Sequence, residues 1–444
     1  MIYVHVPFCR SFCTYCDFYS EVAPKCRQAE DAVSQSALFE RFADALAVEI
    51  RTRKEEIQSA CAASGVKTLY IGGGTPSVLP LGVFQKMLQA LKEVGVVGEF
   101  TEFTVEVNPE DVVEKGAEYI DGLLELGVNR ISMGVQSFDD GILKWMNRRH
   151  DSATAVKAYR ILEEAGVRNI SIDLIFGLPQ LSDELWRETL DKALTISSRG
   201  VAPQHISSYQ LSVEPGSMLA KLVERGKWSE ASDDLCQRQY DMLCETLAAA
   251  GYHHYEISNF AQSGHEAVHN SAYWRHIPYI GLGPGAHSFV CAASRRSIPE
   301  TPSQQSWAPP PPRSTPQKST DFRGPRGWGN VSSILPASSP YKASYERKWN
   351  EGNLNEYLKA GECGDFSAVS GGETLDDEQI AIEKIMLGLR TSAGLKEDVL
   401  RECCDVVALD RAIAVGDLVY LSDGAVRIPE SRFFVSDNII SSIV

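Results

Sequence analysis

Short runs of apolar and β-branched residues alternate with longer amphipathic segments over the first half of the chain. Six of the short runs predict strands, and five of the segments between them have the apolar spacing of helices. The strands are expected at Ile2–Val6, Thr68–Ile71, Phe103–Val107, Arg130–Met133, Ile170–Ile175 and His205–Leu211. The helices are expected at Ser36–Gln58, Leu81–Val94, Lys115–Leu126, Ser152–Ala165 and Asp183–Ser197. This alternation predicts right-handed βαβ units and a parallel sheet.

Six such units predict an α/β fold built on a partial (β/α)6 barrel, because the clear repeat stops near residue 212. A doubly wound sheet remains an alternative on the pattern alone. The loops after the first five strands are rich in glycine and polar residues: PFCRSFCTYC, GGGTPS, EVNPE, GVQSF and GLPQ. Since the carboxyl ends of barrel strands meet at one mouth, these loops predict an active or ligand site there.

A stretch rich in proline and serine separates this half from the end of the chain. Residues 292–340 have few periodic apolar positions, which predicts a disordered, partly polyproline insertion. Docking of its PPPP run to an aromatic-lined module is an alternative interpretation.

Regular patterns return near Glu373. They predict helices at Asp376–Arg390 and Leu395–Cys403, a hairpin at Asp417–Ile428 that turns at Asp423-Gly424, and a closing helix within residues 431–444. These elements suggest a small winged-helix-like domain, which we expect to serve packing or interaction because it has few Lys and Arg. We therefore divide the chain into a barrel core (1–212), a barrel extension (213–291), the insertion (292–340) and a C-terminal helical or winged domain (341–444).

The overall charge argues against some classes of partner. The 444-residue chain has a formal net charge of −16 and a sequence pI of about 5.1, without a dense Lys/Arg block, so we expect no nucleic-acid partner. It has no run of about 18 apolar residues, so we expect no transmembrane segment. The first residues form a strand pattern rather than a cationic leader, so export is not indicated.

Eleven cysteines are scattered along the chain, an odd number that fits reduced thiols in the cytoplasm better than a disulfide framework. Three of them, Cys9, Cys13 and Cys16, form a C-x3-C-x2-C cluster. Three thiolates can hold three irons of a cubane cluster and leave the fourth iron open to a small molecule that carries an amine and a carboxylate. The alternatives are unliganded core thiols and a zinc site completed by His5 or Asp17, although structural zinc prefers two separated pairs of ligands.

The cysteine spacing and its surroundings resemble the radical S-adenosylmethionine (SAM) proteins, and among them the HemN/HemW branch. The resemblance rests on YVHVPFCRSFCTYCDFYS, GGGTPS, GVQSF, IDLIFGLP, YEISNFA, HNSAYW, GLGPGAHSF and FFVSDNII, and covers nearly the whole chain except residues 292 to about 325. It implies a [4Fe–4S] cluster on Cys9, Cys13 and Cys16, SAM on the open iron, a reductant for the cluster, a partial barrel and a HemN-type C-terminal domain.

The resemblance also implies a SAM site made of eight residues: Tyr3, Tyr15, Gly74, Thr75, Glu106, Gln136, Arg148 and Asp173. The two tyrosines would lie beside SAM, and Gly74 and Thr75 would meet its methionine end through backbone groups. The chemistry fits, since carboxylates accept from ribose hydroxyls and ammonium groups, while arginine pairs with a carboxylate.

Two functions compete within this branch. One is an enzyme, oxygen-independent coproporphyrinogen III dehydrogenase, which abstracts hydrogen from propionate side chains with loss of carbon dioxide. The other is a carrier, a HemW-like heme chaperone that delivers heme to an acceptor protein. The chaperone is favoured because Phe18 stands where the dehydrogenases have a fourth cysteine, and Met1 begins at the first strand without their N-terminal extension. Another radical SAM reaction is disfavoured by the match beyond residue 200.

The heme ligands are implied by HNSAYW, residues 269–274, which matches the HNxxYW motif associated with heme in the HemW group. Similar motifs occur in relatives described as dehydrogenases. The resemblance implies His269 as an axial ligand, with Tyr273 and Trp274 beside the porphyrin. A loop histidine bonded to a backbone carbonyl is the alternative for His269, and His265, His276 and His287 are rival ligands. The acceptor protein is unidentified, and its peripheral association with a membrane is left open.

Overall fold

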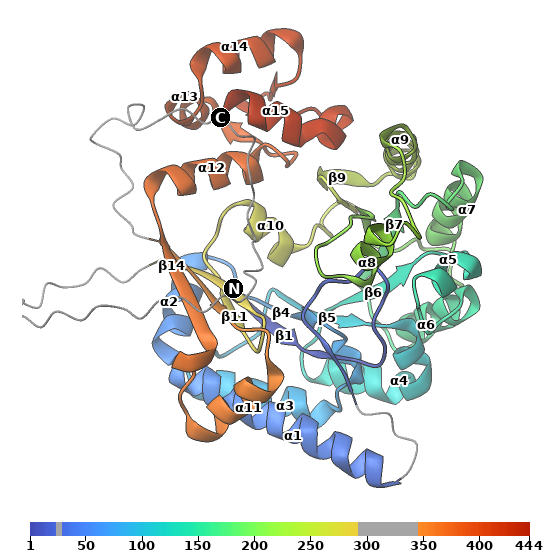
Figure 1. The fold of residues 1–444 in the computed structure, drawn as a ribbon, viewed down its shortest axis with the longest axis vertical. Helices are drawn as coiled ribbons and strands as arrows, with labels where there is room; N and C mark the ends of the chain where they lie inside the picture. Colours follow the sequence, from blue (N-terminus) through green and yellow to red (C-terminus); the bar gives the residue numbers. More distant parts are fainter. Residues whose placement is uncertain (24–28, 292–344) are drawn as a thin grey trace, which may run out of the picture.

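The structure, a computed structural model, describes residues 1–23, 29–291 and 345–444. Its centre is a nine-stranded sheet with the strand order β11-β1-β4-β5-β6-β7-β8-β10-β9. Six of these strands are parallel and follow one another in chain order (Figure 1): β1 (Ile2–Val6), β4 (Thr68–Gly73), β5 (Glu102–Val107), β6 (Arg130–Gln136), β7 (Ile170–Phe176) and β8 (His205–Gln210). The six predicted strands are therefore all present.

The strand order decides between the two predicted architectures. A doubly wound sheet reverses direction at a switch point, whereas the six parallel strands lie across the sheet in chain order from β1 to β8. The outer strands β1 and β8 pair with other strands and not with each other, so the barrel stays open. The predicted partial (β/α)6 barrel is confirmed. Three short strands that the sequence did not predict extend it: β9 (His253–Glu256), β10 (Asn259–Ala261) and β11 (Ile280–Leu282).

Helices cover the outer face of the sheet. The helices of the barrel region, not all of which lie on that face, are α1 (Ala29–Thr52), α2 (Lys54–Ser64), α3 (Leu81–Glu93), α4 (Pro109–Glu125), α5 (Asp140–Trp145), α6 (Ser152–Glu164), α7 (Asp183–Leu194), α8 (Met218–Glu224), α9 (Asp233–Ala249) and α10 (Val268–Trp274). Side chains of Asp151 and Ser182 cap α6 and α7 by accepting from the Thr154 and Leu185 amides.

Two predicted helices differ from those observed. The single helix expected at Ser36–Gln58 is wrong: α1 and α2 are separate, with Arg53 between them at φ −97° and ψ 22°. The helix expected from Lys115 begins at Pro109, the favoured first position of a helix. Gly116 interrupts that helix at φ 71°, so its first part does not share the apolar period of the rest.

The two faces of the barrel strands have opposite chemistry. Side chains that point outward, such as Leu69, Phe103 and Ile131, are fully buried and apolar. Those that point inward are mostly polar, and the strand register places them side by side. One row runs Tyr3–Tyr70–Thr104–Arg130, the next Glu106–Ser132–Ser171–His205, and the third Gly134–Asp173–Ser207–Asn259. The barrel interior is therefore a polar space inside an apolar shell.

Among the described residues, the C-terminal region contains two small sheets and five α-helices. Its elements are β12 (His287–Cys291), β13 (Tyr345–Asn350), α11 (Leu354–Cys363), β14 (Ser370–Leu375), α12 (Asp377–Gly388), β15 (Leu395–Lys396), α13 (Glu397–Cys403), α14 (Val406–Val415), β16 (Val419–Tyr420), β17 (Ala425–Arg427) and α15 (Ser436–Ile443). The hairpin β16–β17 turns at Gly424, with φ 81°, as predicted. Together with α12–α14 it forms the predicted winged-helix-like unit, at the end of the molecule opposite α1 and α11 (Figure 1).

Strands β12, β13 and β14 pair in an antiparallel sheet, in which Cys291 lies opposite Tyr345. The predicted insertion at 292–340 and Cys26 lie outside the described residues. In the part of the chain that the structure describes, no helix is long and apolar enough to cross a membrane.

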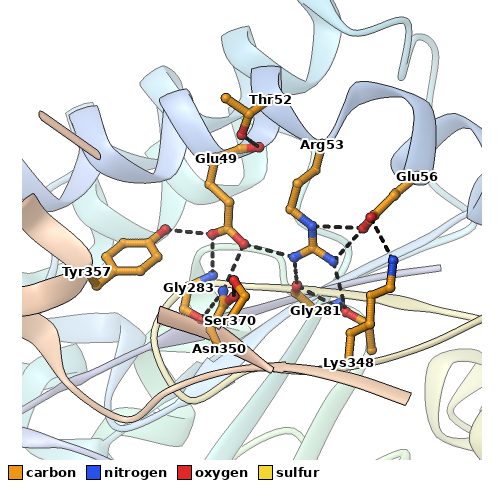
Figure 2. Close-up of polar contacts among 11 residues, drawn as sticks. Glu49, Thr52, Arg53, Glu56, Gly281, Gly283, Lys348, Asn350, Tyr357 and Ser370 are labelled. Atoms are coloured by element: carbon orange, nitrogen blue, oxygen red, sulfur yellow. Dashed lines mark hydrogen bonds and ion pairs between the residues drawn. The ribbon is translucent and has the colours of Figure 1, made fainter. Parts of the chain in front are cut away.

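A buried polar network fastens residues 345–375 to the barrel (Figure 2). At its centre, Glu49 of α1 accepts hydrogen bonds from the Gly283 amide at 2.8 Å, Asn350 Nδ2 at 2.8 Å and the Tyr357 hydroxyl at 2.7 Å. Glu49 also accepts from Arg53, whose NH1 lies 2.9 Å from Glu49 Oε1. The network thus joins the first helix to segments more than 200 residues away in sequence.

Candidate functional site

The three clustered cysteines lie on the loop that follows β1. Its first part, β2 (Phe8–Cys9), pairs with β3 (Glu21–Val22) and closes the loop on itself. Thr14 fixes the middle of the loop: its amide donates to the Met146 carbonyl at 3.0 Å and its hydroxyl to the Trp145 carbonyl at 2.9 Å. The cysteines are thereby held in place by the turn after α5, a helix that the sequence did not predict.

A cavity of about 770 Å³ runs from this loop into the polar interior of the barrel. All three cysteines and all eight residues of the predicted SAM site line it. Within residues 1–23, 29–291 and 345–444, no three His, Cys, Asp or Glu side chains are grouped to hold a single metal ion. The cysteines face a shared space, an arrangement that fits ligands to separate irons of a cluster.

Burial controls the protonation of the thiols. Burial raises the pKa of Cys9, against hydrogen bonds that lower it, and raises the pKa of Cys16 to about 12. Both groups are therefore neutral thiols at pH 7 without a metal. Two donors approach the sulfurs: Thr75 Oγ1 lies 3.5 Å from Cys9 Sγ, and Arg148 NH1 lies 3.4 Å from Cys13 Sγ. Such donors stabilise a thiolate once it forms.

Arg148 is held rigidly beside the cysteine loop. Its NH2 group donates to Asn108 Oδ1 and to the Gly134 carbonyl, at 2.7 Å each. Burial opposes its charge, but nearby Tyr15 and Cys13 outweigh that effect, so its pKa is raised. The Arg148 Nε is buried and has no hydrogen-bond partner in the described part of the chain. A bound anionic group would satisfy that donor.

Gln136 ends β6 in a strained conformation. Its φ is 67°, a left-handed value that non-glycine residues seldom adopt, and the register with β7 shifts beside it. Such strain concentrates at ligand sites, where the surrounding structure enforces it. The backbone therefore turns this side chain toward the cavity at the end of the strand.

Two carboxyl groups lie deeper in the cavity. Glu106 accepts from the Tyr70 hydroxyl at 2.7 Å and the Gly73 amide at 3.1 Å, and burial raises its pKa to about 7. Asp173 accepts from the Ser132 hydroxyl at 3.3 Å, and burial raises its pKa too. Both groups can accept hydrogen bonds from a ligand.

The GGGTPS loop packs against the cysteine loop. The amides of Gly74 and Thr75 donate to the carbonyls of Val6 and Phe8, at 2.8 and 2.7 Å. The predicted contact of Gly74 and Thr75 with SAM would therefore have to use their carbonyls or the threonine hydroxyl. A side chain at Gly74 would lie 2.7 Å from the Phe8 carbonyl, so glycine is required by close packing.

His269 lies at the other end of the cavity, near the first residues of β4 and β5. Its ring is 1% exposed, with Nδ1 2.8 Å from Thr68 Oγ1 and Nε2 2.9 Å from the Tyr273 hydroxyl. Burial lowers its pKa to about 3, so the ring is neutral. Both ring nitrogens have partners inside the protein. Tyr273 also lines the cavity, whereas Trp274 does not.

The rival histidines lie elsewhere. His276 pairs with Glu383 at 2.9 Å, and His287 stacks on Trp349 with ring centres 6.2 Å apart. Neither these two nor His265 line the cavity.

Several cavity residues escaped prediction, above all Tyr70, Arg130, Ser132, His205 and Ser207. The available signal was the polar residue at every second position of otherwise apolar strands. In a single sequence that alternation normally indicates a strand with one face in water. Here it marks the inward face.

Comparison with known proteins identifies the family. Residues 3–193 match the model of the radical SAM superfamily. The heme chaperone HemW of Escherichia coli (strain K12) is 33% identical over 300 residues, which cover 68% of this chain and 72% of the relative. The chain belongs to the HemW family. HemW of Bacillus subtilis (strain 168) is 33% identical over 292 residues, or 65% of this chain and 70% of its own length.

HemW of Synechocystis sp. is 34% identical over 290 residues, so the match spans 65% of that relative's length. Among solved structures, coproporphyrinogen III oxidase (HemN) from Escherichia coli, described as a radical SAM enzyme, has a TM-score of 0.68 at 19% identity. The likeness covers 99% of this chain and 89% of HemN, and it shows the shared fold. Membership of the radical SAM superfamily implies a [4Fe–4S] cluster and SAM.

Proposed function

We propose that this HemW-family protein is a heme chaperone that holds a [4Fe–4S] cluster on Cys9, Cys13 and Cys16, binds SAM and heme, and delivers heme to an acceptor protein. The observation that carries the proposal is the single cavity lined by these cysteines, by all eight predicted SAM residues, and by His269 and Tyr273 of the HNxxYW motif. The heme part rests also on the relatives, which are named heme chaperones.

The donor set fits the cluster and SAM. Three thiols on one loop face the cavity, and hydroxyl and guanidinium donors lie within 3.5 Å of two of the sulfurs. When bound, the cluster supplies an open coordination position and one-electron chemistry. Arg148, with its buried and unpaired Nε, would orient the SAM carboxylate. Glu106 and Asp173 would accept from its hydroxyl or ammonium groups.

For heme, we propose that His269 would be the axial ligand through Nε2. Iron would have to displace the Tyr273 hydroxyl from Nε2, because Thr68 lies on Nδ1. The neutral imidazole suits a metal ligand, since no proton has to be removed first. Tyr273 would then occupy His269 Nε2 until heme iron replaces its hydroxyl group. Trp274 follows Tyr273 directly in the motif, so we keep it as a candidate. It is secondary to Tyr273, because Trp274 does not line the cavity.

The test uses the full-length chain, reconstituted without oxygen with iron and sulfide and then titrated with heme. Tyr273→Phe should leave Nε2 free and keep or strengthen heme binding, whereas His269→Ala should abolish it. The visible spectrum of the bound heme reports an imidazole ligand directly. Heme binding that survives His269→Ala, or that Tyr273→Phe abolishes, contradicts the assignment.

The second candidate is oxygen-independent coproporphyrinogen III dehydrogenase. It is favoured by one observation: every predicted SAM position lines the cavity, as radical chemistry would require. Phe18, which is 65% exposed at the cavity mouth, stands where that enzyme group has a fourth cysteine. Coproporphyrinogen, SAM and a reductant should give no decarboxylated porphyrin if the chaperone proposal is right. Formation of that product would replace it with the enzyme.

The partners follow from the same proposal. They are heme, an acceptor protein and a reductant for the cluster. Among the described residues, the cysteines at positions 9, 13, 16, 61, 236, 244, 363, 403 and 404 are free thiols, which favours a reducing compartment such as the cytoplasm.

A further inference from the structure

Arg130 is a buried cation inside the barrel. It begins β6, lines the cavity and is only 3% exposed. The register places it beside Thr104 of β5, one row deeper than Glu106 and Ser132. It belongs to neither the predicted cluster ligands nor the predicted SAM site.

The protein leaves the Arg130 guanidinium largely unsatisfied. Its recorded hydrogen bond, from NH1 to Thr104 Oγ1, is long at 3.5 Å. Its Nε is buried without a partner, and none of the ion pairs among the described residues within 4.0 Å includes it. A guanidinium has five N–H donors, and a buried donor without an acceptor is costly. The site is therefore arranged for an acceptor that arrives with a ligand.

The surroundings indicate which acceptor would fit. Asp173 and Glu106 face the same cavity, so a strongly charged group such as a phosphate would be repelled. A carboxylate carries one negative charge and can take two parallel hydrogen bonds from a guanidinium. Asn259 and Asn270 also line the cavity, but their side-chain amides already donate to Glu256.

We propose that Arg130 binds a carboxylate group of a ligand that fills the barrel cavity. This rests on the proposed function in one respect: heme, with two propionates, is the expected source. The carboxylate of SAM is the other source, but Arg148 beside Cys13 is better placed for it, since SAM is expected at the cysteine loop. Arg130 would thereby select acid-bearing tetrapyrroles over uncharged ones.

The experiment uses matched probes on the reconstituted full-length protein. Heme is compared with heme dimethyl ester, and SAM with decarboxylated SAM, for the wild type, Arg130→Met and Arg130→Lys. The wild type should bind heme about 10- to 100-fold more tightly than the ester, the range expected for a hydrogen bond to a charged group. Arg130→Met should remove that preference, while Arg130→Lys should keep part of it.

Arg53→Lys is the matched control, because the Arg53 side chain is only 16% exposed but lies in the network of Figure 2, outside the cavity. It should lower stability without changing the preference for heme over its ester. Folding of each variant is checked by circular dichroism and by cluster absorbance.

The outcomes separate the two proposals. If Arg130→Met abolishes only the preference for SAM over decarboxylated SAM, the carboxylate is that of SAM. A wild type that binds heme and its ester equally, and SAM and its analogue equally, overturns the role of Arg130 without any variant. An unchanged preference in folded Arg130→Met does the same. Absence of all heme binding overturns the chaperone proposal, while the SAM pair still decides the role of Arg130.

Discussion

Two arginines with little exposure to solvent show how differently this protein uses the same side chain. Arg53 donates to Glu49 at 2.9 Å, to Glu56 at 2.9 Å and to the Gly281 carbonyl at 2.7 Å. Arg130, in the barrel, has one long contact, to Thr104 at 3.5 Å. Burial opposes the charge of Arg53, but Glu49 and Glu56 outweigh it and raise its pKa.

The difference separates structure from function inside one fold. A saturated network lowers the energy of the folded chain and has no capacity left for a ligand. Buried polar groups without partners lower the stability of the folded chain until a ligand binds them. In this protein, Arg130 and Arg148 are such groups, and both line the cavity that the cysteines also line. Changes in the network around Arg53 should therefore mainly lower stability and spare the site, and changes in the cavity should mainly affect the site.

The largest effect expected on the cavity side comes from a cluster cysteine. Cys13→Ala should abolish the visible absorbance of the reconstituted cluster, because the remaining loop thiols cannot replace the lost ligand. The unfolding free energy of the cluster-free protein should change by less than about 1 kcal/mol. Cys363→Ala is the control, since that thiol is exposed and does not line the cavity. A full cluster signal in Cys13→Ala would refute the ligand assignment.

The counterpart on the network side is Glu49→Ala. It leaves Arg53, Asn350 and the Tyr357 hydroxyl without their acceptor, so the unfolding free energy should fall by about 3–5 kcal/mol. Cluster absorbance per folded molecule should stay the same. Glu362→Ala removes a surface ion pair with Arg41 and should cost less than about 1 kcal/mol in the same denaturant titration. Equal losses in both variants would show that the network contributes no more than a surface pair.

The pH dependence of stability tests whether burial in the cavity raises the pKa of Glu106. Burial raises the pKa of Glu106 from 4.5 to about 7, so the folded chain binds an extra proton between these values. Stability of the cofactor-free protein should therefore fall, by roughly 1–3 kcal/mol, as pH rises from about 4.5 to about 7. Glu106→Gln, neutral at every pH, should show a flatter profile. A wild-type stability that rises over this window would contradict the raised pKa.

The smallest effect is expected for Thr75→Val. It removes the hydroxyl that lies 3.5 Å from Cys9 Sγ and should cost about 1 kcal/mol of stability. It should also lower the reduction potential of the cluster, because a donor to a ligand sulfur stabilises the reduced form. A redox titration followed by electron paramagnetic resonance measures the shift. Thr189→Val, a buried threonine on α7, should leave the potential unchanged.

The outward face of the sheet explains why so much of the barrel could be predicted. Residues such as Leu69 and Ile131 belong to apolar runs that only a buried strand tolerates. That the three cysteines lie together was predictable for another reason, since all three belong to one short loop.

The inward face could not be predicted, because its partners come from distant parts of the chain. His269 meets Thr68 across 201 residues, and Arg130 lies in a polar row that only the strand register assembles. The break between α1 and α2 was not predicted either, because the contacts of Arg53 come from distant parts of the chain. The Arg53 side chain bonds to Gly281 and Ser288, which lie 228 and 235 residues further along the sequence.

The hydrogen bond between Glu49 and Tyr357 can form only late in synthesis of the chain. The two residues are 308 positions apart, which a ribosome covers in roughly 15–60 s at 5–20 residues per second. Strand β1 likewise cannot pair with β11 until residues 280–282 have been synthesised. Until then the nascent chain exposes an open strand edge and an acidic side chain without its partners, so this is the period in which we expect molecular chaperones of the cell to matter most.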